Sequence, residues 1–129
     1  MMLTHVNTIG IQVSDQDQAL DFYVNTLGFE KVQDSPMDEE GTRWIEVAPA
    51  GAQTRIVLSK GYGPQDPGQP GGFTGFVFAA DDIEATCETL EARGVNITVP
   101  LSVEPWGKWA QFADPDGNEF GIWAPVDEE

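Results

Sequence analysis

The sequence has one cysteine, Cys87, and one histidine, His5, so it is poor in the side chains that most often bind metals or form covalent bonds. A single thiol cannot form a disulfide within the chain or a cysteine-based metal cluster. Basic residues are also scarce: six Lys and Arg stand against 22 Asp and Glu, which gives a net charge of −16. A chain this negative repels nucleic acid phosphates and anionic membranes, so we expect neither as a partner.

Long hydrophobic runs are absent as well. No apolar stretch approaches the roughly 20 residues of a membrane span, and the N-terminus does not resemble a signal peptide, so we expect a cytoplasmic protein. The 129 residues, 40% of them hydrophobic, are enough for one domain with a packed core. Scarce lysine and excess acid favour a high-salt habitat, where screening weakens self-repulsion. An acidic protein from an ordinary bacterium is the alternative.

The sequence does contain an internal repeat with an offset of 67 positions. Residues 8–15 alternate apolar and polar and lead into a helical pattern that stops at Gly28; residues 75–82 lead into another that stops at Gly94. The alternation predicts a first strand over residues 5–13. After each helical pattern come three more predicted strands, over residues 29–36, 42–49 and 54–60 and over residues 95–103, 108–113 and 119–125.

This order predicts an α+β fold of two tandem βαβββ units, whose curved mixed sheets surround a cleft. Unit one covers about 1–61 and unit two about 73–129, and both belong to a single domain. The segment at about 61–72, rich in glycine and proline, is the predicted linker. Ser14, with Asp17 three residues on, is the predicted N-cap of the first helix, and Asp81, with Glu84, that of the second.

Short sequence words occur in the same order as in a known superfamily: Val13-Ser14-Asp15, Asp21-Phe22-Tyr23, Leu27-Gly28-Phe29, Asp81-Asp82-Ile83-Glu84-Ala85, Arg93-Gly94-Val95 and Phe112-Ala113-Asp114-Pro115-Asp116-Gly117-Asn118. They span nearly the whole chain, which resembles the vicinal oxygen chelate superfamily of glyoxalase I, extradiol dioxygenases and bleomycin-resistance proteins. The resemblance implies the glyoxalase-like fold. Fold alone does not give function.

Metal-dependent members of that superfamily hold a divalent ion with His, Gln or Glu from four strands. By resemblance, the four places fall here at Thr8, Gly75, about Val57 and Gly121. None of these side chains is a nitrogen or carboxylate ligand, so we expect no metal and no cofactor. His5 lies three residues before the first place and has the opposite strand parity, so its side chain is expected to point away from the cleft.

The resemblance also indicates which residues line the cleft, because the metal places of the family point into it. Alternation then puts Trp44 opposite Trp109 and Glu46 opposite Gln111, with the Arg55 guanidinium near Glu46. Tryptophans beside glycines leave room for a flat or apolar ligand. The predicted ligand-binding residues are Thr8, Trp44, Glu46, Arg55, Trp109, Gln111 and Trp123. No catalytic residue is assigned.

Other interpretations of these residues remain open. The tryptophans can fill the interior or seal a dimer interface, and Glu46 with Arg55 can form a structural ion pair. Trp106 and Lys108, beside a proline and a glycine, are predicted to form a loop at the rim of the cleft.

The favoured hypothesis is a metal-free protein that binds a small aromatic or amphipathic molecule, as bleomycin-resistance proteins sequester a drug. The alternative is a metal-dependent lyase, isomerase or dioxygenase of the same superfamily with a non-standard site; a metal-free enzyme with Glu46 or Glu119 as base is a variant of it. A dimer without any ligand is the third hypothesis. By resemblance we expect a homodimer and a small organic ligand as partners.

Overall fold

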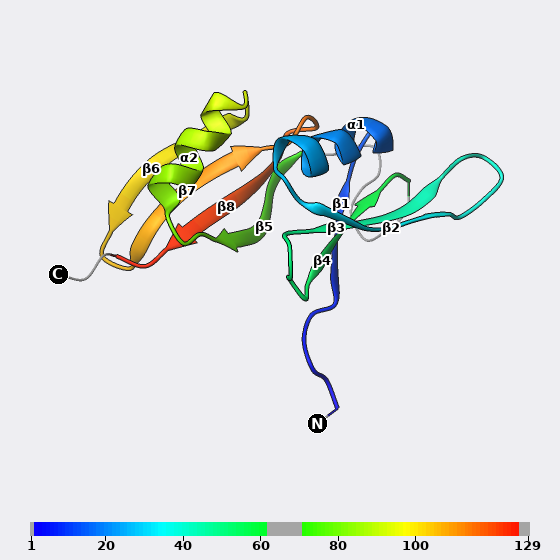
Figure 1. Cartoon of the computed structure of the whole chain (residues 1–129), viewed down its shortest axis with the longest axis horizontal. Helices are drawn as coiled ribbons and strands as arrows, with labels where there is room; N and C mark the ends of the chain where they lie inside the picture. The colour runs from blue at the N-terminus through cyan, green and yellow to red at the C-terminus, as the bar shows by residue number, and fades with distance from the viewer. Residues whose placement is uncertain (1, 62–70, 127–129) are drawn as a thin grey trace. The chain divides into compact units, whose positions relative to one another are not determined.

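The computed structural model describes residues 2–61 and 71–126 (Figure 1). Contacts divide the chain into two compact units, Met1–Pro70 and Gly71–Glu129, and each is described by itself. Most of the predicted linker, residues 62–70, lies outside the described residues. Its last residue, Gly72, is not linker, because it begins the first strand of the second unit.

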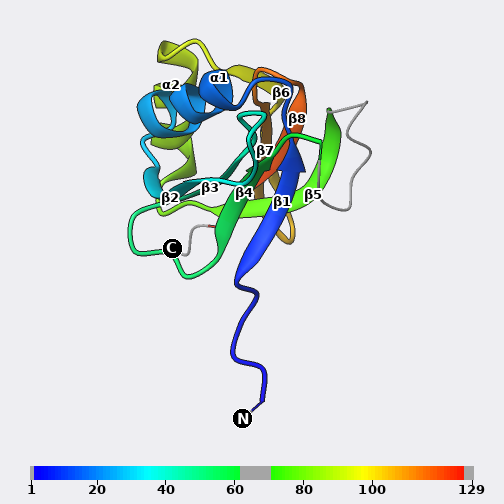
Figure 2. The ribbon, with the colours of Figure 1, turned by 90° about the vertical axis from the view of Figure 1, so that its right-hand side faces the viewer.

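The first unit follows the predicted order of strand, helix and further strands. Its elements are β1 (Thr8–Gln12), α1 (Gln16–Asp21), the π-helical η1 (Phe22–Thr26), β2 (Glu30–Pro36), β3 (Arg43–Ala48) and β4 (Arg55–Ser59). The sheet has the order β1-β4-β3-β2. Strands β1 and β4 are parallel and run side by side in Figure 2, and the other pairs are antiparallel. The predicted first strand was too long: residues 5–7 precede β1, and His5 lies exposed in that segment.

The second unit repeats the arrangement. Its elements are β5 (Gly72–Ala79), α2 (Ile83–Ala92), β6 (Asn96–Glu104), β7 (Gly107–Ala113) and β8 (Asn118–Ala124). The sheet order is β5-β8-β7-β6, with β5 parallel to β8. In Figure 1, α2 lies along one face of this sheet. The α+β fold with a duplicated βαβββ unit is therefore confirmed.

Each unit packs its core from alternate residues of its strands. Ile45 and Val47 of β3 and Ile56 and Leu58 of β4 are buried in the first unit. In the second, three phenylalanines from three strands pack together: the ring centroid of Phe120 lies 5.4 Å from that of Phe78 and 5.5 Å from that of Phe112. Phe112 and Phe120 are 3% and 0% exposed, and burial to this degree contributes about 1.5–3 kcal/mol per side chain to the free energy of unfolding.

Both helices begin one residue later than predicted. The N-cap of α1 is Asp15, not Ser14, and that of α2 is Asp82, not Asp81. Each of these aspartates has an extended backbone, and its carboxylate accepts the N–H of the residue three positions on at 3.0 Å. Ser14 and Asp81 have suitable side chains, but the chain turns into the helix only after the next residue.

The helix ends follow the glycine signals. Gly28 has φ 84° and Gly94 has φ 82°, a conformation that glycine adopts without steric cost. The first helix is less regular than predicted, because α1 passes into η1, where the Leu27 N–H bonds the Phe22 carbonyl at 2.9 Å. None of the helices within residues 2–61 and 71–126 has the length and apolar character needed to cross a membrane.

Candidate functional site

In each unit, a tryptophan is bonded to the side chain two residues further along the same strand. Trp44 Nε1 donates to Glu46 Oε2 at 2.7 Å on β3, and Trp109 Nε1 donates to Gln111 Oε1 at 3.0 Å on β7. Residues two apart on a strand share one face of the sheet, so the bond holds each indole against that face. Trp44 and Glu46, both predicted to face the cleft, thus share one face of the first sheet, and Trp109 and Gln111 share one face of the second.

The neighbouring strand supplies a third residue in both units. Arg55 Nη1 donates to Glu46 Oε1 at 3.3 Å, and Gln111 Nε2 contacts Glu119 Oε1 at the limiting distance of 3.5 Å. Both carboxylate oxygens of Glu46 therefore accept hydrogen bonds. The third residue is cationic in the first unit and anionic in the second, although the two occupy corresponding places in β4 and β8.

Ion pairs to the helices show which face of each sheet carries the tryptophan. Arg43 Nη1 contacts Asp17 of α1 at 2.7 Å, and Lys108 Nζ contacts Glu84 of α2 at 2.6 Å. Arg43 and Lys108 each precede the tryptophan of their strand and so point to the opposite face. The tryptophans therefore lie on the faces turned away from the helices. The prediction that Lys108 belongs to a rim loop is wrong: it is a buried residue of β7 on the helix side.

Thr8 lies at the start of β1, and its Cα partner in the parallel register is Arg55. Partners in a parallel pair share a face, so Thr8 stands on the same side of the sheet as Arg55 and Glu46. In the first unit, the structure thus brings together four of the predicted residues: Thr8, Trp44, Glu46 and Arg55.

Aromatic side chains gather on the corresponding face of the second unit. The ring centroid of Trp109 lies 5.9 Å from that of Trp106 and 6.5 Å from that of Phe73, and Trp123 is the Cα partner of Trp109 on β8. Phe73, Trp106 and Trp123 are 51%, 59% and 36% exposed. We call Phe73, Trp106, Trp109 and Trp123 the aromatic face.

Phe73 was not among the predicted site residues. The sequence offset pairs Thr8 with Gly75, but the β5–β8 register shifts between Phe73 and Val77, and Gly75 within this stretch has φ 83°. The shift places Phe73 opposite Glu119, which is the place that Thr8 takes opposite Arg55. A glycine inside a predicted strand is the one signal in the sequence that indicates such a bulge.

The places that hold a metal in the superfamily do not fit one here. Thr8, Val57, Gly75 and Gly121 carry no nitrogen or carboxylate ligand, and a Cβ on Gly121 would come within 2.6 Å of Trp109 Cζ2. The indole ring therefore fills the space that a ligand side chain at position 121 would need. Within residues 2–61 and 71–126, no three His, Cys, Asp or Glu side chains are placed to share a metal ion.

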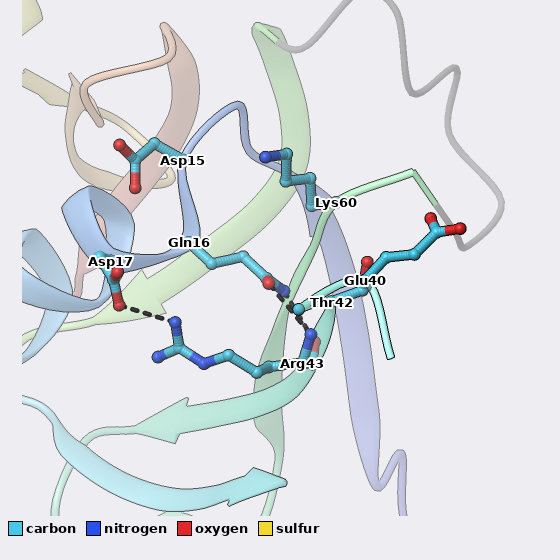
Figure 3. Close-up of a pocket in the computed structure, with 8 residues that line it drawn as sticks. Asp15, Gln16, Asp17, Glu40, Thr42, Arg43 and Lys60 are labelled. Atoms are coloured by element: carbon cyan, nitrogen blue, oxygen red, sulfur yellow. Dashed lines mark hydrogen bonds and ion pairs between the residues drawn. The ribbon is translucent and has the colours of Figure 1, made fainter. Parts of the chain in front are cut away.

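A polar hollow of about 160 Å³ lies beside α1 (Figure 3). Its lining residues bind one another: Gln16 Nε2 donates to the carbonyls of Arg43 at 2.7 Å and Leu58 at 2.9 Å, and Gln16 Oε1 accepts the Arg43 N–H. The Arg43 guanidinium bonds Asp17 and Asp34, and its hydrogen bonds lower the pKa of the Asp34 carboxyl. These contacts attach α1 to β3 and β4, so we assign the hollow a structural role.

Comparison with known proteins gives a family match over most of the chain. A sequence model described as Glyoxalase/Bleomycin resistance protein/Dioxygenase superfamily matches residues 4–122. The uncharacterized protein YetH of Bacillus subtilis is 34% identical over 119 residues, which cover 92% of this chain and 97% of that protein.

Solved structures agree with this match. A member of the same superfamily from Sphaerobacter thermophilus is 44% identical, with a TM-score of 0.88, over 96% of this chain and 99% of that one. TnmS3, an antibiotic binding protein from a Streptomyces species, is 42% identical, with a TM-score of 0.85, over 98% of this chain and 99% of that one.

Proposed function

The chain belongs to the glyoxalase/bleomycin resistance protein/dioxygenase superfamily, and we propose that it is a binding protein for a small, flat organic molecule. One observation carries the proposal: the Trp109 ring occupies the space beside Gly121, where metal-dependent relatives need a ligand side chain. An aromatic surface thus replaces a metal-binding one. Aromatic rings offer a large contact area at a low cost in side-chain entropy, which suits the binding of planar molecules.

The proposed contacts are the residues that stand on the faces of the sheets turned away from the helices. Hydrogen bonds to Glu46 and Gln111 fix the orientation of their tryptophans before any ligand arrives, which lowers the ordering cost of binding. The description of TnmS3 as an antibiotic binding protein supports this class of function for a chain 42% identical to it. The proposed ligand-binding residues are Thr8, Trp44, Glu46, Arg55, Trp109, Gln111 and Trp123.

We also propose that the protein forms a homodimer. Val32 of β2 and Val103 of β6 are 41% and 64% exposed, and these two strands end their sheets. The edge of a sheet presents backbone groups that can pair with a second chain. Sedimentation equilibrium gives the mass directly, and a monomer over the working concentration range would contradict this part of the proposal.

Titration with the neutral tricyclic acridone tests the binding function. In isothermal calorimetry we expect heat that saturates as acridone is added. Tryptophan fluorescence should be quenched over the same concentration range. Trp123→Ala, which removes an exposed ring of the aromatic face, should weaken binding. Leu3→Ala is the control, because Leu3 is an exposed apolar residue in the segment before β1, outside both sheets. Equal weakening by both variants would contradict the proposed site.

Exposure to Mn, Fe, Co, Ni and Zn separates this function from the metal-dependent enzyme. For a binding protein without a metal centre, we expect no stoichiometric metal after desalting and no shift of the melting temperature. One equivalent of tightly bound metal with a clear thermal shift would overturn the proposal and favour a lyase, isomerase or dioxygenase with a non-standard site.

A further inference from the structure

Resting on the proposed function, we infer that the aromatic face of the second unit selects organic cations, with Glu119 as the anionic contact. The ligand class is a planar or amphipathic molecule with a protonated amine. Two features of this face support that chemistry: the orientation of its indoles and the sign of its charged side chains. The net negative charge of the whole chain supports it as well.

Two of the three indole N–H groups of the aromatic face are already directed at protein acceptors. Trp109 Nε1 donates to Gln111 at 3.0 Å, and Trp123 Nε1 lies 3.4 Å from the Trp106 carbonyl oxygen. A ligand therefore meets the ring surfaces of these tryptophans rather than their donors. The face of an indole carries negative charge density and attracts cations.

Charged side chains on this face have one sign. Glu119 is half-buried on β8, its Cα partner on β5 is Phe73, and its side chain makes a long contact with Gln111. The basic residues within 71–126 are Arg93 and Lys108, and both lie on the side of α2: Arg93 caps its C-terminus and Lys108 bonds Glu84. The face thus offers a hydrogen-bond acceptor with a negative charge and, within the described residues, no cation to receive an anionic ligand.

The net charge of −16 also favours cationic ligands. A strongly negative protein raises the local concentration of cations and accelerates their association, an effect that falls with ionic strength. The field alone does not select a planar ligand. Selection requires the rings and Glu119 together.

Three tricyclic probes of nearly the same shape test the inference: 9-aminoacridine, protonated at neutral pH, acridone, neutral, and acridine-9-carboxylate, anionic. We expect the affinity to fall in that order, measured by calorimetry at fixed ionic strength. Glu119→Gln should weaken the binding of 9-aminoacridine about tenfold, because it removes the charge from the hydrogen-bond acceptor. The same variant should weaken acridone binding far less, because the amide that replaces the carboxylate still accepts a hydrogen bond.

Glu88→Gln is the matched control. Glu88 is exposed on α2, so this variant changes the net charge equally but leaves the aromatic face intact. Equal weakening by Glu88→Gln and Glu119→Gln would mean that the field alone attracts the cation, and would overturn the inference. Weakening by Glu119→Gln alone supports it.

The probes also separate failure of the inference from failure of the proposed function. If none of the three binds, the binding function itself is contradicted. If acridone and acridine-9-carboxylate bind as tightly as 9-aminoacridine, the protein binds planar molecules and only the selection for cations is wrong.

Discussion

Trp109 lies with its six-membered ring against Gly121 on the adjacent strand, so close that a Cβ at position 121 would overlap the ring. The φ of Gly121 is not positive, so this position needs glycine for space rather than for conformation. Because the indole is also bonded to Gln111, the ring cannot move away without breaking that hydrogen bond.

Gly121→Ala should therefore lower the free energy of unfolding by about 1–3 kcal/mol, the usual cost of overpacking. Urea unfolding followed by circular dichroism measures it, and the emission of Trp109 should shift as well. Gly10→Ala is the control, since a Cβ there would meet Ser59 Oγ at an ordinary 3.6 Å. Equal effects of the two substitutions would contradict the close contact.

Glu46 has separate roles toward Trp44 and Arg55, and two substitutions distinguish them. Glu46→Gln keeps an acceptor for the Trp44 indole and removes only the charge facing Arg55, whose side chain is 41% exposed. We expect a loss of about 0–1 kcal/mol in the free energy of unfolding. Glu46→Leu removes the acceptor too and should cost about 1–3 kcal/mol. Equal melting temperatures for the two variants would show that the indole bond contributes nothing.

Local signals in the sequence predicted most of the fold. Two of these signals are the alternation of Ile9, Ile11 and Val13 and the helix ends at Gly28 and Gly94. Both depend only on residues near in sequence, so they can be recognised without knowledge of tertiary contacts. The N-caps were each misplaced by one residue because Ser14 beside Asp15, and Asp81 beside Asp82, offer adjacent candidates of similar quality.

The site was predictable where strand parity decides and not where register does. Parity predicts that Trp44 and Glu46 face the same side of their sheet, and Trp109 and Gln111 the same side of theirs, which agrees with the hydrogen bonds within each pair. Phe73 was not predicted as a site residue, because the β5–β8 register shifts before Val77 and a fixed sequence offset cannot represent that shift.

Gln16 should be one of the costliest polar residues of the first unit to replace. Its buried amide bonds the Arg43 and Leu58 carbonyls and the Arg43 N–H, so Gln16→Ala leaves backbone groups of two strands without those partners. We expect a loss of about 2–4 kcal/mol in the free energy of unfolding. Gln18→Ala, an exposed change on the same helix, should stay within about 0.5 kcal/mol. Thermal unfolding of both variants tests this, and a mild effect of Gln16→Ala would contradict the role given to its amide.

Asp34 should contribute to acid sensitivity. The hydrogen-bonded Arg43 guanidinium lowers the pKa of this carboxyl in the folded protein. The unfolded chain therefore binds the proton more tightly, and the stabilisation is present above about pH 4 and lost as the pH falls through the lowered value. Asp34→Asn should flatten the loss of stability below about pH 4. If the free energy of unfolding of Asp34→Asn falls with pH as steeply as that of the unmodified protein, the pairing of Asp34 with Arg43 is contradicted.

Salt should stabilise this protein. With a net charge of −16, repulsion between carboxylates outweighs the few ion pairs, such as that of Arg43 with Asp17. From about 0.01 to 0.15 M NaCl, the Debye length falls from about 30 to about 8 Å, which screens the repulsion before effects specific to the salt become large. We expect the melting temperature, followed by scanning calorimetry, to rise most steeply in this range. A constant or falling melting temperature would mean that the carboxylates do not destabilise the fold. A further rise above about 1 M would favour the predicted high-salt habitat over an ordinary one, because screening is already nearly complete there.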